Sequence, residues 1–259
     1  MNTQLNNSIV LITGASSGIG AACAQQFAQA GSKLILLARR LDKLKELKEL
    51  LEHEFPQCSV YVQQCDVRNQ QEVASVIQAL PEELQAIDIL VNNAGLSRGL
   101  EKIHEGVLQN WEEMIDTNVK GLLYVTRAVS PGMVARKKGM IINIASIAGR
   151  ETYPAGNVYC ATKSAARTIS EATRIDLNGT GIRVVNIDPG MVETEFSIVR
   201  FRGDKSRADQ VYKGFQPLSG DDVADAVMYC ASRPPHVTIA DILILPTAQA
   251  NTTTVYKEL

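Results

Sequence analysis

The sequence has no excess of positive charge. It contains 26 Lys and Arg residues against 28 Asp and Glu residues, which gives a formal net charge of −2. A nucleic-acid backbone or an anionic membrane surface requires a basic stripe, and this balance does not supply one. We therefore expect neither nucleic acid nor a membrane surface among the partners of this protein.

Long apolar runs are also missing. No segment approaches the roughly 18 uninterrupted apolar residues that span a bilayer. The N-terminus, MNTQLNNSIVLITG, lacks the basic region and long apolar region of a secretory leader. These absences predict a cytoplasmic protein with no cleaved leader.

Clusters of metal-binding or disulfide-forming residues are absent as well. The five cysteines are odd in number and widely spaced, never as CxxC, and the three histidines stand far apart. We expect reduced thiols and no metal. These residues are Cys23, Cys58, Cys65, Cys160, Cys230, His53, His104 and His236.

What the sequence does have is a regular alternation of short β-branched runs and amphipathic stretches. With 45% hydrophobic and 21% charged residues over 259 positions, a sizeable core can be buried. Seven strands separated by helices predict a single α/β domain over residues 1–259, a Rossmann-type doubly wound parallel sheet with helices on both faces. Strands are expected at 8–13, 33–38, 60–64, 87–91, 140–145, 183–187 and 241–245. Helices are expected from the glycine-rich turn to about 30, and at 41–55, 70–80, 111–115, 118–136, 157–178 and 220–231.

Two segments depart from this regular pattern. Pro131 should kink or break the helix predicted at 118–136. The longest irregular stretch, from Gly190 to about Arg207, follows a strand late in the chain. We interpret a loop at about 190–216 as a mobile substrate lid, and a plain surface excursion is the alternative.

A glycine-rich turn, TGASSGIG at residues 13–20, follows the first strand and opens a helix. Gly14 allows the tight turn, Gly18 lets the backbone approach a pyrophosphate, and Gly20 permits close helix packing. The free N–H groups at the helix start face the anion. This order of elements predicts a dinucleotide-binding site.

The end of the second strand indicates which nicotinamide dinucleotide binds. An acidic residue there would bond the adenosine ribose 2′-hydroxyl, but Ala38 is followed by Arg39 and Arg40. A guanidinium can hold a 2′-phosphate, so NADP is favoured over NAD. The alternatives are solvated strand-end arginines and a competing role for Asp42.

Polar residues that end other strands complete a crevice. Asp66 ends the third strand, and residues 92–95 (NNAG) end the fourth. Ser146 ends the fifth strand and could hydrogen-bond a reacting oxygen. The carboxyl ends of such strands are where dinucleotides lie.

Tyr159 and Lys163 are four residues apart and therefore share a helix face. A tyrosine is a poor base at pH 7, but a neighbouring ammonium group and an oxidised nicotinamide favour its phenolate. Asn118, at the start of an earlier helix, could either cap that helix or hold a water for proton relay.

Taken together, the motifs TGASSGIG, NNAG, INIASIAG, YCATK and DPGMVET resemble the short-chain dehydrogenase/reductase family over essentially the whole chain. The resemblance implies a catalytic tetrad of Asn118, Ser146, Tyr159 and Lys163. It also places Ile187 and Thr194 near the nicotinamide. The implied cofactor contacts are Gly14, Ser16, Ser17, Gly18, Ile19, Gly20, Arg39, Arg40, Asp66, Val67, Asn93, Ala94, Gly95, Tyr159, Lys163, Pro189, Gly190, Val192 and Thr194.

Four longer segments are similar to NADP-dependent 3-hydroxy acid dehydrogenases: VNNAGL, SIAGRETYPAGNVYCATK, PGMVETEFSIVRFRGD and PLSGDDVADAV. This similarity implies reversible hydride transfer between NADP(H) and a small 3-hydroxy acid such as serine, allo-threonine or 3-hydroxypropionate, or the matching semialdehyde or keto acid. A broad carbonyl or 3-oxoacyl reductase is the alternative within the family. A non-catalytic dinucleotide-sensing regulator is the alternative from another class.

A small hydroxy acid offers little apolar area, so an arginine should read its carboxylate. Arg150, Arg200 and Arg202 are the candidates, beside Ser146 and Tyr159 at the reacting oxygen. If Arg200 and Arg202 instead pair with loop acids such as Glu195 or Asp204, they have no substrate role. Family resemblance also implies a homotetramer, consistent with apolar residues around much of the helices predicted at 118–136 and 157–178.

Overall fold

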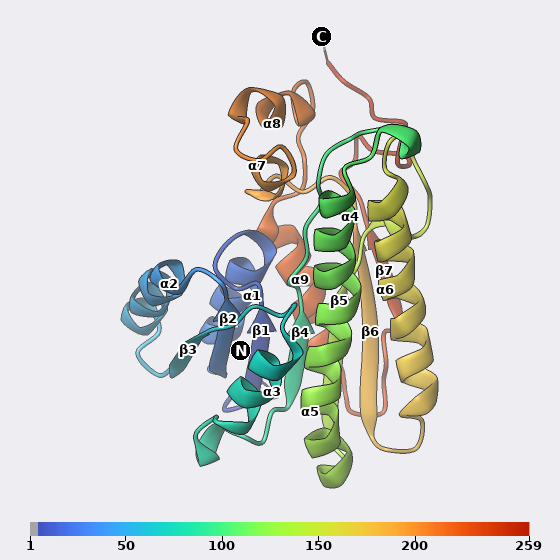
Figure 1. Cartoon of the computed structure of the whole chain (residues 1–259). Helices are drawn as coiled ribbons and strands as arrows, with labels where there is room; N and C mark the ends of the chain where they lie inside the picture. Colours follow the sequence, from blue (N-terminus) through green and yellow to red (C-terminus); the bar gives the residue numbers. More distant parts are fainter. Residues whose placement is uncertain (1–4, 259) are drawn as a thin grey trace.

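A parallel sheet of seven strands organises the computed structural model, which describes residues 5–258 (Figure 1). The strand order is β3-β2-β1-β4-β5-β6-β7, and every neighbouring pair is parallel. The expected doubly wound α/β fold is therefore confirmed. The expected lack of a leader rests in part on residues 1–4, which lie outside the described residues. The strands are β1 (Ile9–Thr13), β2 (Lys33–Ala38), β3 (Val60–Gln64), β4 (Ile89–Asn92), β5 (Gly139–Ile144), β6 (Ile182–Pro189) and β7 (Asp241–Ile244).

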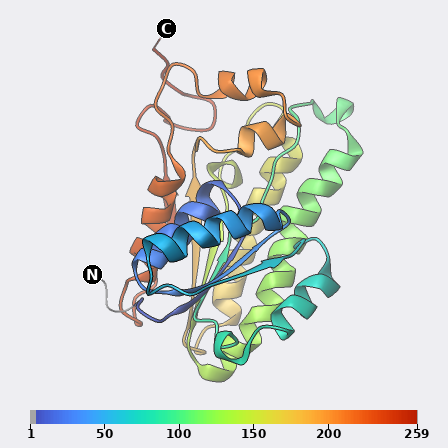
Figure 2. The same ribbon diagram turned by 90° about the vertical axis from the view of Figure 1, so that its left-hand side faces the viewer.

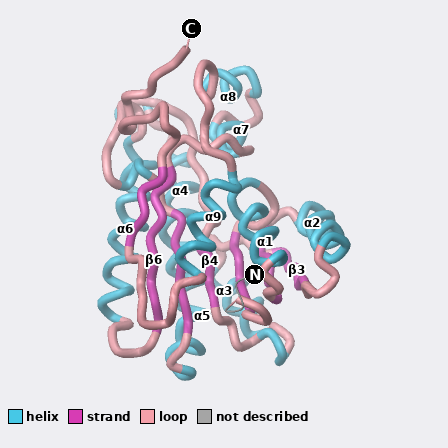
Figure 3. The backbone as a smooth tube through the Cα atoms, turned by 180° about the vertical axis from the view of Figure 1, so that it is seen from behind, coloured by secondary structure: helices cyan, strands magenta, loops and turns pink. Residues whose placement is uncertain are grey.

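Helices cover both faces of the sheet, as Figures 2 and 3 show. One apolar core joins the sheet to α1, α2 and α9, and a second joins its other face to α3 and α5. The helices are α1 (Gly18–Gln29), α2 (Leu41–Glu54), α3 (Gln70–Gln78), α4 (Leu108–Ile115), α5 (Leu122–Arg136), α6 (Asn157–Asp176), α7 (Phe196–Arg200), α8 (Lys205–Val211) and α9 (Gly220–Ala231).

The strand β1 shows why the sequence builds this sheet. All five of its residues are buried because both of its faces are covered, which requires a continuous apolar run. Leu11 pairs with Ile35 of β2 on one side and with Leu90 of β4 on the other. The direction of strand order reverses at β1, and in open α/β sheets ligands bind at such a point, beyond the carboxyl ends of the strands.

The helix predicted at 118–136 is present, but it differs from the prediction at its start and at Pro131. Residues Asp116–Gly121 form a π-helical segment, and α5 then runs without interruption through Pro131. Pro131 is exposed, so water can reach the carbonyl that the missing N–H leaves without a partner. The proline therefore does not break the helix.

The prediction that the chain is irregular from Gly190 to about Arg207 is wrong. It contains α7 and α8, which stand above the carboxyl edge of the sheet (Figure 1). Asp204 begins α8 by accepting a hydrogen bond from the Arg207 N–H at 3.1 Å. Local capping thus orders a segment that has little hydrophobic periodicity.

The structure also bears on the cysteines and on membrane-spanning helices. The five cysteines are free thiols, and all five are buried. Within residues 5–258, no helix has the length and apolar character needed to cross a bilayer.

Candidate active site

A cavity of about 480 Å³ lies at the carboxyl ends of the central strands, a size usual for a small-molecule site. It gathers most of the residues that the sequence singles out. Those lining it are Gly14, Ser16, Ser17, Gly18, Ile19, Arg39, Arg40, Asp66, Val67, Asn93, Ala94, Gly95, Ser146, Tyr159, Lys163, Pro189, Gly190, Val192, Thr194 and Arg200. Those outside its lining are Gly20, Asn118, Arg150, Ile187 and Arg202.

The glycine-rich turn is shaped by its contact with the NNAG segment. Gly14 has φ +65°, and a Cβ there would lie 2.9 Å from the Ala94 Cα. A Cβ on Gly20 would lie 2.5 Å from the Asn93 Nδ2. That amide donates hydrogen bonds to the carbonyls of Thr13 at 2.9 Å and Gly14 at 3.1 Å. Gly20 therefore closes the turn onto Asn93 rather than onto a ligand.

The two strand-end arginines have different surroundings. Arg40 donates to the hydroxyls of Ser16 at 3.1 Å and Ser17 at 2.9 Å, and it forms an ion pair with Glu195 at 2.8 Å. Arg39 lines the same cavity. Asp42, the competing carboxylate, is outside the lining. The end of β2 thus presents cations and no carboxylate to the cavity.

These residues fit a phosphorylated dinucleotide. A Cβ on Gly14 would collide with backbone, so only glycine leaves room for this turn, which feeds directly into the N-terminus of α1. Arg39 supplies a guanidinium at the end of β2, where an adenosine ribose would lie. The chain would hold the pyrophosphate with the turn and the 2′-phosphate with this guanidinium.

Tyr159 lies on the first turn of α6 and is only 8% exposed. Burial raises the pKa of its phenol above the usual value, and Tyr153 acts in the same direction. The Arg200 guanidinium and a hydrogen bond with Ser146 lower this pKa, but by less than burial raises it. The side chains around it therefore favour the protonated phenol. The phenolate expected from the sequence depends also on an oxidised nicotinamide and stays a prediction.

Lys163 lies one turn further along α6 and donates from Nζ to the Ile144 carbonyl at 3.0 Å. Burial lowers the pKa of its ammonium group to about 8, and the negative charge of Asp188 opposes that shift. The ammonium group therefore predominates at pH 7 and loses its proton in mildly alkaline solution.

Ser146 stands where the chain leaves β5. Its hydroxyl oxygen accepts a hydrogen bond from the Ala148 N–H at 3.1 Å. Its own N–H donates to the carboxylate of Asp188 at 3.2 Å. Both bonds fix the direction of the hydroxyl, which shares the cavity with Tyr159.

Asn118 is within the π-helical segment, not at a helix start, so the capping interpretation is wrong. Its Oδ1 accepts from the Leu96 N–H at 2.8 Å, and its Nδ2 donates to the Leu96 carbonyl at 2.8 Å and to Thr162 at 3.0 Å. Asn118 thus ties the segment after NNAG to the helix that carries Tyr159. The π-turn places it there, as such turns often do at functional sites.

Of the three candidate arginines, the structure brings only Arg200 to the cavity. Its guanidinium lies 5.3 Å from the centre of the Tyr159 ring and donates to the Tyr153 hydroxyl at 3.0 Å. Arg202 instead donates to Asn110 at 2.6 Å and contacts Glu113. Arg150 binds the carboxylate of Asp188 at 2.6 Å. Neither loop arginine pairs with the loop acids that the sequence suggested.

Some cavity residues were missed by the sequence reasoning. Tyr153 and Phe196 flank Tyr159 and Arg200, and Phe196 packs on Tyr159 with ring centres 5.8 Å apart. Gln249, near the C-terminus, accepts from the Met191 N–H at 2.8 Å. The aromatic residues lie beside motifs and could have been singled out. Nothing in the sequence pattern indicates Gln249.

The fold, the glycine turn and the Tyr159–Lys163 pair define a dinucleotide-dependent oxidoreductase, and the chain belongs to the short chain dehydrogenase family, whose model matches residues 8–204. It is 46% identical over 243 residues to the NADP-dependent 3-hydroxy acid dehydrogenase YdfG of Escherichia coli O6:H1, covering 93% of this chain and 96% of that protein. It is 43% identical to the NADP-dependent 3-hydroxy acid dehydrogenase of Schizosaccharomyces pombe, covering 99% of both.

Solved structures agree with this assignment. The closed form of a serine dehydrogenase complexed with NADP+ matches with TM-score 0.90 and 45% identity, covering 96% of this chain and 99% of that one. The serine dehydrogenase of Escherichia coli matches with TM-score 0.80 and 42% identity, covering 93% and 99%. The fold and the family of this chain are therefore shared with proteins of known structure.

Proposed function

We propose that this protein is an NADP-dependent dehydrogenase of small 3-hydroxy acids, such as serine, allo-threonine or 3-hydroxypropionate, or of the matching semialdehydes and keto acids. Relatives 43–46% identical over nearly the whole chain carry this name. The arginines at the end of β2 favour NADP over NAD. Bound NADP(H) supplies or accepts the hydride.

The proton is handled by the chain's own residues. Tyr159, protonated at neutral pH, donates its proton to the carbonyl oxygen in reduction and takes it back in oxidation. Ser146 directs that oxygen, and the Lys163 ammonium group stabilises the phenolate that forms. Asn118 positions the backbone and the helix around this pair, and we expect it to hold a relay water.

The observation that carries the substrate class is the position of Arg200. Its guanidinium lies over the rings of both Tyr159 and Phe196, 5.3 Å from each ring centre. Its Nε is buried without a hydrogen-bond partner in the described structure. A buried donor without a partner is costly, and a substrate carboxylate beside Tyr159 would satisfy it.

Arg200→Ala tests this assignment. We expect the KM for serine or 3-hydroxypropionate to rise about tenfold or more, because a charge-assisted hydrogen bond is lost. An uncharged alcohol or aldehyde of similar size should be affected much less. Steady-state rates from NADPH absorbance at 340 nm with both substrate types measure the difference.

The matched control is Arg202→Ala, since Arg202 lies two residues away and contacts Asn110 and Glu113 instead of the cavity. It should leave the KM for the acid within about twofold of the wild-type value. An equal loss for charged and uncharged substrates in Arg200→Ala would contradict the carboxylate role and favour a broad carbonyl or 3-oxoacyl reductase.

The proposal also covers a substrate lid, the cellular compartment and the oligomeric state. The segment at about 190–216, with α7 and α8, would serve as its substrate lid, because Arg200 and Phe196 come from it. Five free thiols suit the reducing cytoplasm. We further propose a homotetramer, supported by large apolar side chains exposed on α5 and α6, namely Leu123, Val134 and Ile175.

A further inference from the structure

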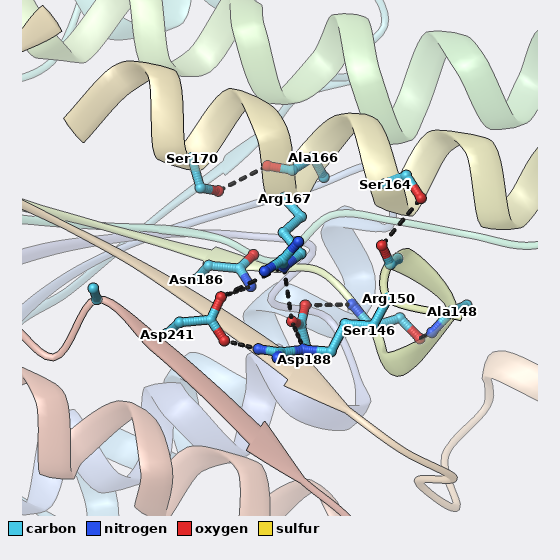
Figure 4. A network of polar contacts seen from close by, with 12 residues as sticks. Ser146, Ala148, Arg150, Ser164, Ala166, Arg167, Ser170, Asn186, Asp188 and Asp241 are labelled. Atoms are coloured by element: carbon cyan, nitrogen blue, oxygen red, sulfur yellow. Dashed lines mark hydrogen bonds and ion pairs between the residues drawn. The ribbon is translucent and has the colours of Figure 1, made fainter. Parts of the chain in front are cut away.

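A network of charged side chains surrounds one buried carboxylate beside Ser146 (Figure 4), and none of these charged residues lines the cavity. Its centre is Asp188 in β6, whose side chain is fully buried. Arg150 approaches it from the turn after Ser146, with Nε 2.6 Å from one carboxylate oxygen. Arg167 of α6 lies 3.9 Å from the same oxygen. A fully buried carboxylate is retained only where such partners compensate for its lost hydration.

A second carboxylate, Asp241 in β7, completes the network at its outer edge. It forms an ion pair with Arg150, lies 3.6 Å from the Arg167 Nε and accepts from Asn186 at 3.3 Å. Its side chain remains 33% exposed. Asp241 therefore shares both arginines with Asp188, but within residues 5–258 it forms no hydrogen bond with Ser146.

Asp188 joins this network to the reacting groups. Its other oxygen accepts the Ser146 N–H at 3.2 Å, just beyond the last ladder bond, in which the Ala145 N–H donates to Ile187. The Asp188 carboxylate thus replaces a backbone carbonyl as the acceptor where the chain leaves β5. Arg167 is four residues after Lys163 and shares its face of α6, so the same carboxylate also faces the helix of Tyr159.

We propose that Asp188 is a positioning residue for hydride and proton transfer: its carboxylate holds the Ser146 backbone and, through Arg150 and Arg167, sets the spacing between Ser146 and the helix that carries Tyr159 and Lys163. This inference rests on the proposed function only for the use of Ser146, Tyr159 and Lys163. It does not depend on which substrate they act on.

The charge of Asp188 has a second consequence, for Lys163. Burial lowers the pKa of Lys163 to about 8, and Asp188 is the charged group that opposes the shift. Arg150 and Arg167 face Asp188, and Asp241 on β7 pairs with both of them, while Tyr159 shares the helix of Lys163. Without the Asp188 charge, the positive charges of Arg150 and Arg167 are no longer neutralised by it. The pKa of Lys163 therefore falls further.

The test is Asp188→Asn, which keeps an oxygen that can accept the Ser146 N–H but removes the charge. With any carbonyl substrate that the wild-type enzyme reduces, we expect kcat to fall about tenfold or more, because small misplacements of reacting groups are costly. The KM for NADPH should stay within about twofold. The alkaline limb of the reduction rate should move to lower pH, since reduction needs the Lys163 ammonium group.

The matched control is Asp241→Asn, which takes a carboxylate from the same two arginines without touching Ser146. It should lower the melting temperature but leave kcat and the pH profile near wild type. Carbon NMR of the Lys163 ε-methylene, assigned with Lys163→Arg, measures the lowered pKa of Lys163 in Asp188→Asn without relying on turnover. If Asp188→Asn does not fold, Asp188→Asn/Arg150→Gln removes one charge of each sign and is read by the same criteria.

The outcomes distinguish the positioning role of Asp188 from the proposed substrate class. Identical kinetics and pH profiles for Asp188→Asn and Asp241→Asn, or a change in melting temperature alone, would overturn the positioning role. A wild-type enzyme that reduces simple aldehydes but no 3-oxo acid would contradict the proposed substrate class and leave the Asp188 comparison intact.

Discussion

Tyr159 combines two properties that its sequence motif does not reveal together. It is buried, so its pKa is raised, and it contacts both the Phe196 ring and the Arg200 guanidinium. A raised pKa keeps the proton on the phenol at pH 7, which suits proton donation. Oxidation requires the phenolate, which the Arg200 guanidinium and the hydrogen bond with Ser146 favour by lowering this pKa.

Removing only the phenol oxygen tests that role. Tyr159→Phe should reduce turnover to about a hundredth of wild type or less, the usual loss when a general acid is removed. NADP affinity should be nearly unchanged, as measured by fluorescence titration. Tyr153→Phe removes a phenol oxygen from the same cavity and should retain kcat within about tenfold. A residual rate well above a hundredth in Tyr159→Phe would mean that another group moves the proton.

Among the elements, β2 carries the choice of cofactor at its end. Arg40 is engaged by Ser16, Ser17 and Glu195, and so links the glycine-rich turn to the segment that leads into α7. That leaves Arg39 as the guanidinium we expect to bind the 2′-phosphate. The sequence predicted this role for both arginines, and the structure gives them different surroundings.

Arg39→Ala should therefore weaken NADP binding by about tenfold, because a charge-assisted contact is lost, and leave NAD binding within about twofold. Titration of the variant and the wild type with both cofactors measures the ratio of NADP affinity to NAD affinity, which should fall. Lys45→Ala, which removes an exposed cation of α2 outside the cavity lining, is the control and should change neither affinity. Equal affinities for NADP and NAD in the unmodified protein would contradict the cofactor assignment.

At the scale of the whole molecule, apolar side chains remain exposed on helices that cover the sheet. Leu123 is 42% exposed on α5, and Ile175 is 68% exposed on α6. Single exposed hydrophobic residues are ordinary, but here they lie on two helices that cover the same face of the sheet (Figure 1). This arrangement supports the proposed assembly of several copies.

Light scattering at micromolar concentration should give about four times the chain mass of 28.2 kDa. Replacing Ile175 by Glu should shift the mass toward smaller species if α6 lies in an interface, because a charge would be buried there. Glu171→Gln, on the same helix, is the control. A monomer in the unmodified protein would contradict the tetramer.

The amino-acid sequence by itself determined the sheet and the glycine turn, and it predicted the residues that we propose to react. Continuous apolar runs such as that of β1 can be buried only between two helical layers, and the four-residue spacing of Tyr159 and Lys163 places them on one helix face. These signals are local, since each depends on residues close together in the chain.

Only the tertiary structure decided the rest. Arg200 and Arg202 are two residues apart and alike in sequence, yet one faces Tyr159 and the other faces Glu113. Asp188 is 42 residues from Ser146, and their hydrogen bond exists because β5 and β6 are neighbours in the sheet. Contacts between distant segments, and the burial that shifts the pKa of Tyr159, arise from packing that no local pattern records.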